Sequence, residues 1–181
     1  MSVTIDGTYG INKFTGIDVF PAGVPIQVVN TIYTSRTSFT IQTYDTDVPG
    51  GSITITPKGN NSKFLITVRY FFESDSSYNI VYNIQRNGTR INVGGLTNNW
   101  SGIAMATQTY GGGNDNSSTP EILNFSTLDT SGSTAGTPIT FKLVSSSDTA
   151  RTSYVNRVFS SDGTSAYENG TSEIIIMEIK G

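Results

Sequence analysis

Carboxylates are the side chains of this chain that could do acid–base chemistry, because the chain contains neither histidine nor cysteine. Six of them stand out by position: Asp45, Asp47, Asp115, Glu168, Glu173 and Glu178. Glycoside hydrolysis needs two carboxylates that face each other across a cleft, about 5–10 Å apart. No recognised motif places a pair in that way, so we interpret these acids as solvated loop residues. We expect that the chain is not an enzyme; a carboxylate-only glycoside hydrolase is the alternative.

The missing residue types exclude several kinds of site. Without histidine and cysteine there is no Ser-His-Asp triad, no thiolate nucleophile, no disulfide and no zinc site of the Cys or His type. The stretch "GGGNDNSS" at 111–118 offers oxygen ligands around Asp115. Calcium prefers six to eight oxygens with several carboxylates, and one aspartate does not meet that need. We therefore expect no metal and no cofactor.

A sugar-binding loop is the next candidate. The stretch "GGLTNNWSG" places the single tryptophan, Trp100, directly after Asn98 and Asn99. An exposed indole can stack on a sugar ring while amides bond its hydroxyl groups. Together with Asp115, these residues form our candidate glycan site. The alternative is that Trp100 opens a strand and closes one end of the core, which is the common fate of a large aromatic residue.

Charge and hydropathy exclude two classes of partner. The net charge is -3, and the eleven basic residues are scattered along the chain. Nucleic-acid binding needs a clustered basic surface, so we expect none. The longest purely apolar run is "IIIM" at 174–177, far below the roughly 20 residues that span a bilayer. We expect no membrane partner.

The elements that must position any site are strands. Alternation with period two puts Phe64, Ile66, Val68, Tyr70 and Phe72 on one face of the segment 62–72. The segment "ITFKLV" likewise puts Ile139, Phe141 and Leu143 on one face. About ten such strands, separated by turns rich in Gly, Asn, Asp and Pro, predict an all-β fold: an antiparallel β-sandwich of jelly-roll-like type.

Two segments carry more specific predictions. In "YNIQRNGTRINV" at 82–93, Asn87-Gly88 favours a type I′ hairpin turn. Such a turn pairs Ile84 with Ile91 and Tyr82 with Val93, and leaves Gln85, Arg86 and Arg90 largely in solvent. The last strand, "SEIIIMEIK", is apolar on both faces. It predicts either a central strand covered on both sides or a face at a subunit contact.

The first 25 residues differ from the rest. They are broken by Gly and Pro, so they hold no long strand, yet they are too apolar for a disordered tail. We predict an extended N-terminal arm over residues 1–25 and a β-sandwich domain over residues 26–181. The arm residues expected to bind a partner are Ile5, Tyr9, Ile11 and Phe14. An ordinary first strand and loop is the alternative.

Four stretches resemble a known group of proteins. They are "PIQVVNT", "SITITPKGNNSKFLITV", "GTPITFKLV" followed by "ARTSYVNR", and the terminal "SEIIIMEIK", and they extend from Pro25 to Gly181. This pattern resembles the β-rich modules of tailed-bacteriophage virion proteins, which occur in tail-fibre, head-fibre and capsid decoration proteins. The resemblance implies a virion structural protein that assembles in the host cytoplasm and self-associates as a homotrimer.

One departure from that group narrows the expectation. Fibre proteins usually carry this module after a shaft, and this sequence shows no heptad, collagen-like tract or β-helix repeat. We therefore expect a capsid decoration (cement) protein that binds the major capsid protein and stabilises the head. The alternative is a fibre or baseplate receptor-binding tip with lectin-like recognition of glycans.

Overall fold

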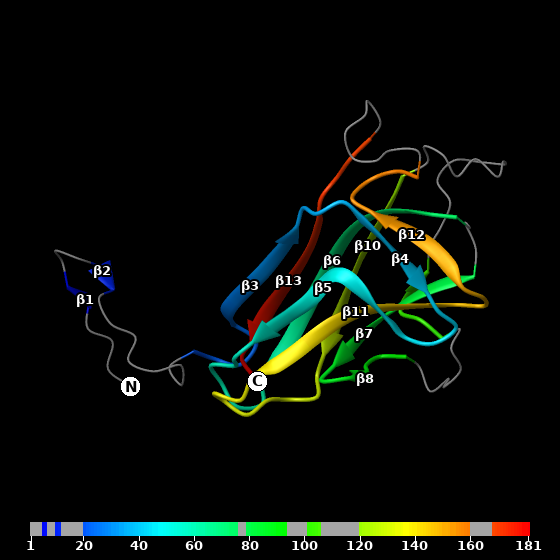
Figure 1. The fold of residues 1–181 in the computed structure, drawn as a ribbon. Coiled ribbons are helices and arrows are strands. Elements are labelled where there is room, and N and C mark those ends of the chain that lie inside the picture. The colour runs from blue at the N-terminus through cyan, green and yellow to red at the C-terminus, as the bar shows by residue number, and fades with distance from the viewer. Residues whose placement is uncertain are drawn as a thin grey trace.

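The computed structural model describes residues 20–75, 79–93, 101–105, 120–159 and 168–181, together with the backbone of the short strands at 5–6 and 10–11. All regular structure in these residues is β-strand. Two antiparallel sheets face each other (Figure 1), which confirms the predicted all-β sandwich. Within the same residues no helix has the length and hydropathy needed to cross a membrane.

The larger sheet has six strands: β3 (Pro25–Tyr33), β4 (Thr37–Ile41), β6 (Lys63–Ser74), β10 (Glu121–Asp129), β12 (Arg151–Val155) and β13 (Ser172–Ile179). One edge of β6 pairs with β10 over nearly its whole length. The other edge pairs first with β13 and then with β12. The sheet therefore divides at β6 into two branches, because β3 extends it beyond β13 and β4 extends it beyond β12.

The second sheet has five strands: β5 (Thr46–Ile55), β7 (Ile80–Arg86), β8 (Thr89–Arg90), β9 (Ala104–Met105) and β11 (Ile139–Ser147). β11 lies between β5 and β7, and the far edge of β7 pairs with both β8 and β9. A separate pair, β1 (Ile5–Asp6) and β2 (Gly10–Ile11), lies apart from both sheets in Figure 1. The jelly-roll order and the binding role of the arm stay predictions.

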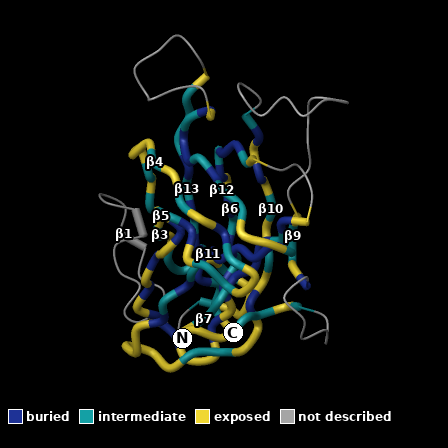
Figure 2. The backbone as a smooth tube through the Cα atoms, turned by 45° about the vertical axis from the view of Figure 1, so that its right-hand side comes forward, coloured by how far each residue is buried: buried dark blue, intermediate teal, exposed yellow. Residues whose placement is uncertain are grey.

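The core lies between the two sheets, where Figure 2 shows the buried residues along the middle of the strands. The alternation predicted for β6 is confirmed, since its five apolar residues from Phe64 to Phe72 are all 2% exposed or less. Ile139, Phe141 and Leu143 of β11 face them from the other sheet. The rings of Phe64 and Phe141 meet with centroids 5.6 Å apart, a distance at which aromatic pairs add to simple area burial.

The hairpin prediction is confirmed at its turn and wrong beyond it. Asn87 and Gly88 both have positive φ, 48° and 85°, as a type I′ turn requires. The amide of Ile91 donates to the carbonyl of Ile84 at 3.0 Å. β8 then ends, so Tyr82 pairs with Ala104 of β9 and not with Val93.

Arg86 was predicted to lie largely in solvent, and this prediction is wrong. Its guanidinium donates to Asp129 at 2.7 Å and lies 5.8 Å from the centroid of the Phe64 ring. Asp129 is only 1% exposed, and it also accepts from the amide of Ser131. The arginine therefore joins the end of β7 to the end of β10, one strand from each sheet, and closes that end of the sandwich.

Candidate interaction surface

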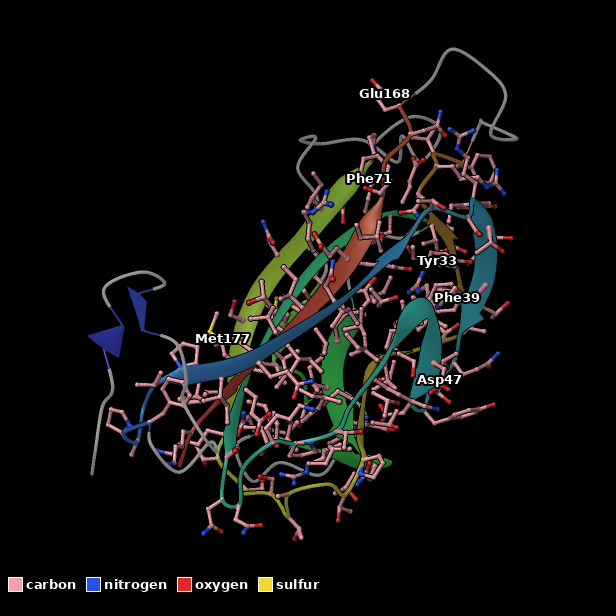
Figure 3. All side chains as sticks on the ribbon, turned by 90° about the vertical axis from the view of Figure 1, so that its left-hand side faces the viewer. Tyr33, Phe39, Asp47, Phe71, Glu168 and Met177 are labelled. Carbon is pink, nitrogen blue, oxygen red and sulfur yellow. The ribbon has the colours of Figure 1, made fainter. Side chains whose placement is uncertain are left out.

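The outer face of the six-stranded sheet carries side chains from four adjacent strands. The strand register places Val28 of β3 beside Met177 of β13, Met177 beside Leu65 of β6, and Leu65 beside Leu128 of β10. Val28 is 58% exposed and Leu128 is 41% exposed. In Figure 3 the labelled Met177 side chain projects away from the second sheet. We call these four residues the apolar row.

The next positions along the same strands are uncharged. They are Asn30, Ile175, Thr67 and Ser126, which lie side by side in the register. The hydroxyl groups of Thr67 and Ser126 are 2.9 Å apart and hydrogen-bonded. Ile175 is half-buried, so the apolar surface continues from the row into this neutral strip.

The third strip contains an ion pair. Arg69 lies 3.7 Å from Glu173, and the amide of Asn30 donates to Glu173 at 3.1 Å. Ile32 and Ile122, each 57% exposed, lie on the two edge strands of the same face. Large exposed apolar side chains that gather on one face of a protein mark an interaction site more often than scattered ones do.

The sequence signal for this face is a strand with apolar residues on both of its sides, and the final strand is not the only one that shows it. The segments "PIQVVNTIY" of β3 and "EILNFSTLD" of β10 also carry apolar residues at both parities of the alternation. For the final strand, this pattern predicted either a central position or a subunit contact, and the structure confirms the central position. β13 is central, between β3 and β6, with Ile174 and Ile176 buried. Its other face is half-buried among the described residues, so it is not covered on both sides by them.

The structure describes two of the four predicted arm residues. Ile5 and Ile11 are opposite each other in the β1–β2 pair, whereas Tyr9 and Phe14 lie outside the described residues. The segment that follows is fixed to the end of β13. The amide of Gly23 donates to the carbonyl of Lys180, and the ammonium group of Lys180 donates to the carbonyl of Phe20. The arm therefore joins the domain at the β3–β13 side of the outer face.

The candidate glycan residues Asn98, Asn99, Trp100 and Asp115 all lie outside the described residues. So does the rest of the stretch 111–118, which was not expected to bind calcium. Among the residues that are described, no group of three or more Asp or Glu side chains could hold a metal ion.

Asp45 and Asp47 each form an ion pair with a basic side chain. The guanidinium of Arg90 donates to both oxygens of Asp45, at 2.7 and 2.5 Å, and the amide of Gln85 donates to the same carboxylate. Asp47 accepts from the ammonium group of Lys142. Arg90 was predicted to lie largely in solvent, but this bidentate contact covers much of it. The contact raises the pKa of Arg90.

The interpretation of the six acids as loop residues is wrong for Asp47, which belongs to β5, and for Glu173 and Glu178, which belong to β13. Glu178 is fully buried. Its carboxylate accepts hydrogen bonds from the amides of Lys58 and Gly59 and from the hydroxyl of Ser62, the last at 2.7 Å. The side chain points inward because β13 alternates, and the turn after β5 supplies the donors.

Two further buried acids carry no signal in the sequence. Glu73 is 1% exposed and accepts from the amide of Phe159, and Glu121 is 8% exposed at the start of β10. Burial, and in smaller part the neighbouring Glu73 carboxylate, raises the pKa of Glu121 to about 7. No periodic pattern announces either residue, since each lies at the end of its strand.

No model of a known protein family matches the chain, and no curated protein matches its sequence.

Proposed function

We propose that the chain is a structural protein of a tailed-bacteriophage virion: a capsid decoration protein that self-associates as a homotrimer and binds the major capsid protein. The observation that carries the proposal is the apolar row on the outer face of the six-stranded sheet. Exposed and half-buried apolar residues in a row across four strands favour burial against protein. The sequence resemblance to virion modules supplies the setting.

A second copy of the same chain is the occupant that the charges favour. Arg69 and Glu173 neutralise each other within the face. Lys63 at the start of β6 is a further exposed charge of this face, so its net charge stays small. The strip next to the apolar row contains amide and hydroxyl groups that can hydrogen-bond to a neighbouring copy. Large apolar side chains exposed on an open sheet face also promote aggregation, and self-association removes them from water.

The arm supplies the second contact. Ile5, Tyr9, Ile11 and Phe14 would bury against the major capsid protein, at roughly 25 cal/mol per Å² of apolar area removed from water. Because residues 20–24 are fixed to the end of β13, the arm leaves each subunit at a defined place. A trimer would present three such arms, and their combined attachment would exceed that of one arm.

Light scattering tests the self-association. The native chain should have three times the 19.4 kDa mass of one chain at micromolar concentration. Leu128→Asp and Val28→Asp each place a charge in the apolar row and should give folded monomers. The control is Ser52→Asp, which adds a charge to the exposed surface of β5 and should stay trimeric. A native chain that is monomeric throughout overturns the subunit contact.

Capsid binding tests the arm. A chain that lacks residues 1–19 keeps Phe20 and its contact with Lys180, so it should fold and stay trimeric. Mixed with capsids stripped of their decoration, it should no longer sediment with them, whereas the full chain should. Full occupancy by the shortened chain would show that the arm is not the capsid contact.

A further inference from the structure

A pocket of about 210 Å³ lies between β9 of one sheet and β10 of the other. Five of the residues that line it are apolar and come from β6, β9 and β10: Phe72, Ala104, Met105, Ile122 and Leu123. Two polar residues line it as well, Glu121 and Asn124. The pocket is therefore an opening in the side of the sandwich with one acid in its wall.

Glu121 is the unusual member of this lining. More than nine-tenths of the residue is buried, yet its Oε2 atom has no hydrogen-bond partner among the described residues. A buried carboxylate without a partner is costly, because it has lost water and gained nothing in return. Natural proteins rarely leave such an atom unpaired unless it serves a ligand or a function.

The charges around Glu121 have the same sign as its own. Glu73 of β6 is the neighbouring carboxylate, and its repulsion adds to burial in raising the pKa of Glu121. Burial, and in smaller part the Glu121 charge, raises the pKa of the Tyr82 phenol in β7. The β9 residues of the lining, Ala104 and Met105, carry no charge. Among the residues that the structure describes, the pocket lining thus holds no cation that could neutralise Glu121.

We propose that this pocket binds an ammonium or guanidinium group carried on an apolar stem. The cation would donate to the free Oε2 of Glu121, and the stem would pack against Phe72, Met105 and Leu123. Asn124 offers a further polar contact to the ligand. This proposal is independent of the virion function, since it concerns the gap between β9 and β10 and uses no residue of the apolar row.

A metal ion fits the same site poorly. Calcium prefers six to eight oxygen ligands, and the described residues contain no group of three acids that could hold a metal. The volume also limits the ligand. Pockets for drug-sized molecules measure about 300–1,000 Å³, so this one has room for a short chain only. A free alkylamine and a lysine or arginine side chain of a partner protein share that chemistry.

Titration followed by NMR amide shifts tests the proposal on the native chain. The probes are n-butylamine and butylguanidine, with 1-butanol as the neutral analogue of similar shape. We expect the cations to shift the amides of Ala104 and Leu123 in a saturable way and butanol to have little effect. Glu121→Gln should weaken cation binding about tenfold or more, the equivalent of one hydrogen bond to a charged group. Glu173→Gln removes the same charge outside the pocket and should leave binding unchanged.

A second variant keeps the test independent of the charge. Ala104→Leu narrows the pocket while Glu121 stays in place, and it should abolish binding. The native chain should also bind the amine more tightly as the pH rises from 6 to 8, by about tenfold, because Glu121 and not the amine changes its charge in this range.

Peptides distinguish the two sources of the cation. A blocked pentapeptide with a central lysine is compared with the same peptide carrying acetyl-lysine. Binding of butylamine and not of the lysine peptide identifies a small free amine as the ligand, and binding of the lysine peptide identifies a partner's side chain. The proposal is overturned if no cation shifts the pocket amides, if butanol binds as well as butylamine, or if Glu121→Gln binds with native affinity.

Discussion

The hydroxyl of Ser172 donates to the side-chain oxygen of Asn156 at 2.7 Å, at the point where the six-stranded sheet divides. The same hydroxyl accepts from the amide of Phe71 in β6 at 3.0 Å. The amide of Asn156 donates to the carbonyl of Phe71, also at 3.0 Å. β12 ends and β13 begins beside this one residue of β6, so the two side chains satisfy the backbone where the ladder is interrupted.

Asn156→Ala should destabilise the fold by about 3–5 kcal/mol. Its side-chain amide donates to the carbonyls of Tyr33 and Ser35, which would be left without that partner. Its φ of 59° also disfavours alanine. Asn156→Gly avoids the φ cost and should be less destabilised, by about 1 kcal/mol. Urea unfolding measures both. Equal stability of the alanine variant and the native chain would show that the division of the sheet at β6 does not depend on the hydrogen bonds of Asn156.

Tyr33 packs directly over Gly50, which couples the edge strand β3 to β5 of the other sheet. A Cβ atom at Gly50 would lie 2.2 Å from the Cγ atom of Tyr33, and the φ of Gly50 is 72°. Gly88 has a similar φ of 85° but nothing within 4 Å of such an atom. The two glycines therefore separate backbone strain from steric conflict.

Gly50→Ala should cost about 3 kcal/mol or more, whereas Gly88→Ala should cost only about 1–2 kcal/mol from its backbone conformation. The excess at Gly50 arises because the Tyr33 ring must leave its position against the core. Thermal and urea unfolding of the two variants give the difference, and near-ultraviolet circular dichroism reports the tyrosine environment. Similar costs at both positions would mean that Tyr33 moves aside freely.

Glu178→Gln should destabilise the chain by about 2–4 kcal/mol. The buried carboxylate accepts from two backbone amides and a hydroxyl, and an amide side chain would direct its own NH₂ group at these donors. Glu173→Gln is the matched control on the same strand, where a solvent-accessible contact is lost and about 0.5 kcal/mol is expected. Denaturant midpoints of the two variants decide the matter; a larger loss at Glu173 would contradict the assignment.

The sequence predicts the parts of this fold that depend on local pattern. The alternation of β6 and β11 identifies the core residues, because a strand shows one face to the interior. The turn at Asn87-Gly88 is predictable because Asn and Gly tolerate the two adjacent positive φ angles that a type I′ turn requires. The double apolar pattern of β13 correctly indicates a central strand, and the same signal in β3 and β10 would have located the apolar row.

Features that depend on long-range pairing could not be predicted in this way. Arg86 occupies a solvent-facing position by hairpin counting, but Asp129 of the opposite sheet draws it inward. From sequence alone Glu178 looks like an exposed residue near the C-terminus, because nothing local shows that the turn at 57–62 supplies its hydrogen-bond donors. Glu121 and Glu73 become neighbours only through the pairing of β6 and β10, which joins segments about fifty residues apart. Alternation specifies a face of a strand, but not the strand that lies beside it.

Glu121 makes the stability of the domain depend on pH near neutrality. Its pKa rises from 4.5 to about 7 on folding, so the folded chain holds a proton that the unfolded chain has released between these values. Stability therefore falls as the pH rises from about 4.5 to about 7. The full effect of such a shift is about 3 kcal/mol.

Glu121→Gln removes this dependence, because the amide stays neutral at every pH. At pH 8 the variant should be more stable than the native chain, by up to about 3 kcal/mol, and at pH 4 the two should unfold at the same denaturant concentration. The change of stability with pH isolates the ionisation of Glu121 from any packing effect of the substitution, which would be the same at both values. Urea unfolding at pH 4, 6 and 8 measures it. A constant difference across the three would show that folding does not shift the pKa of Glu121.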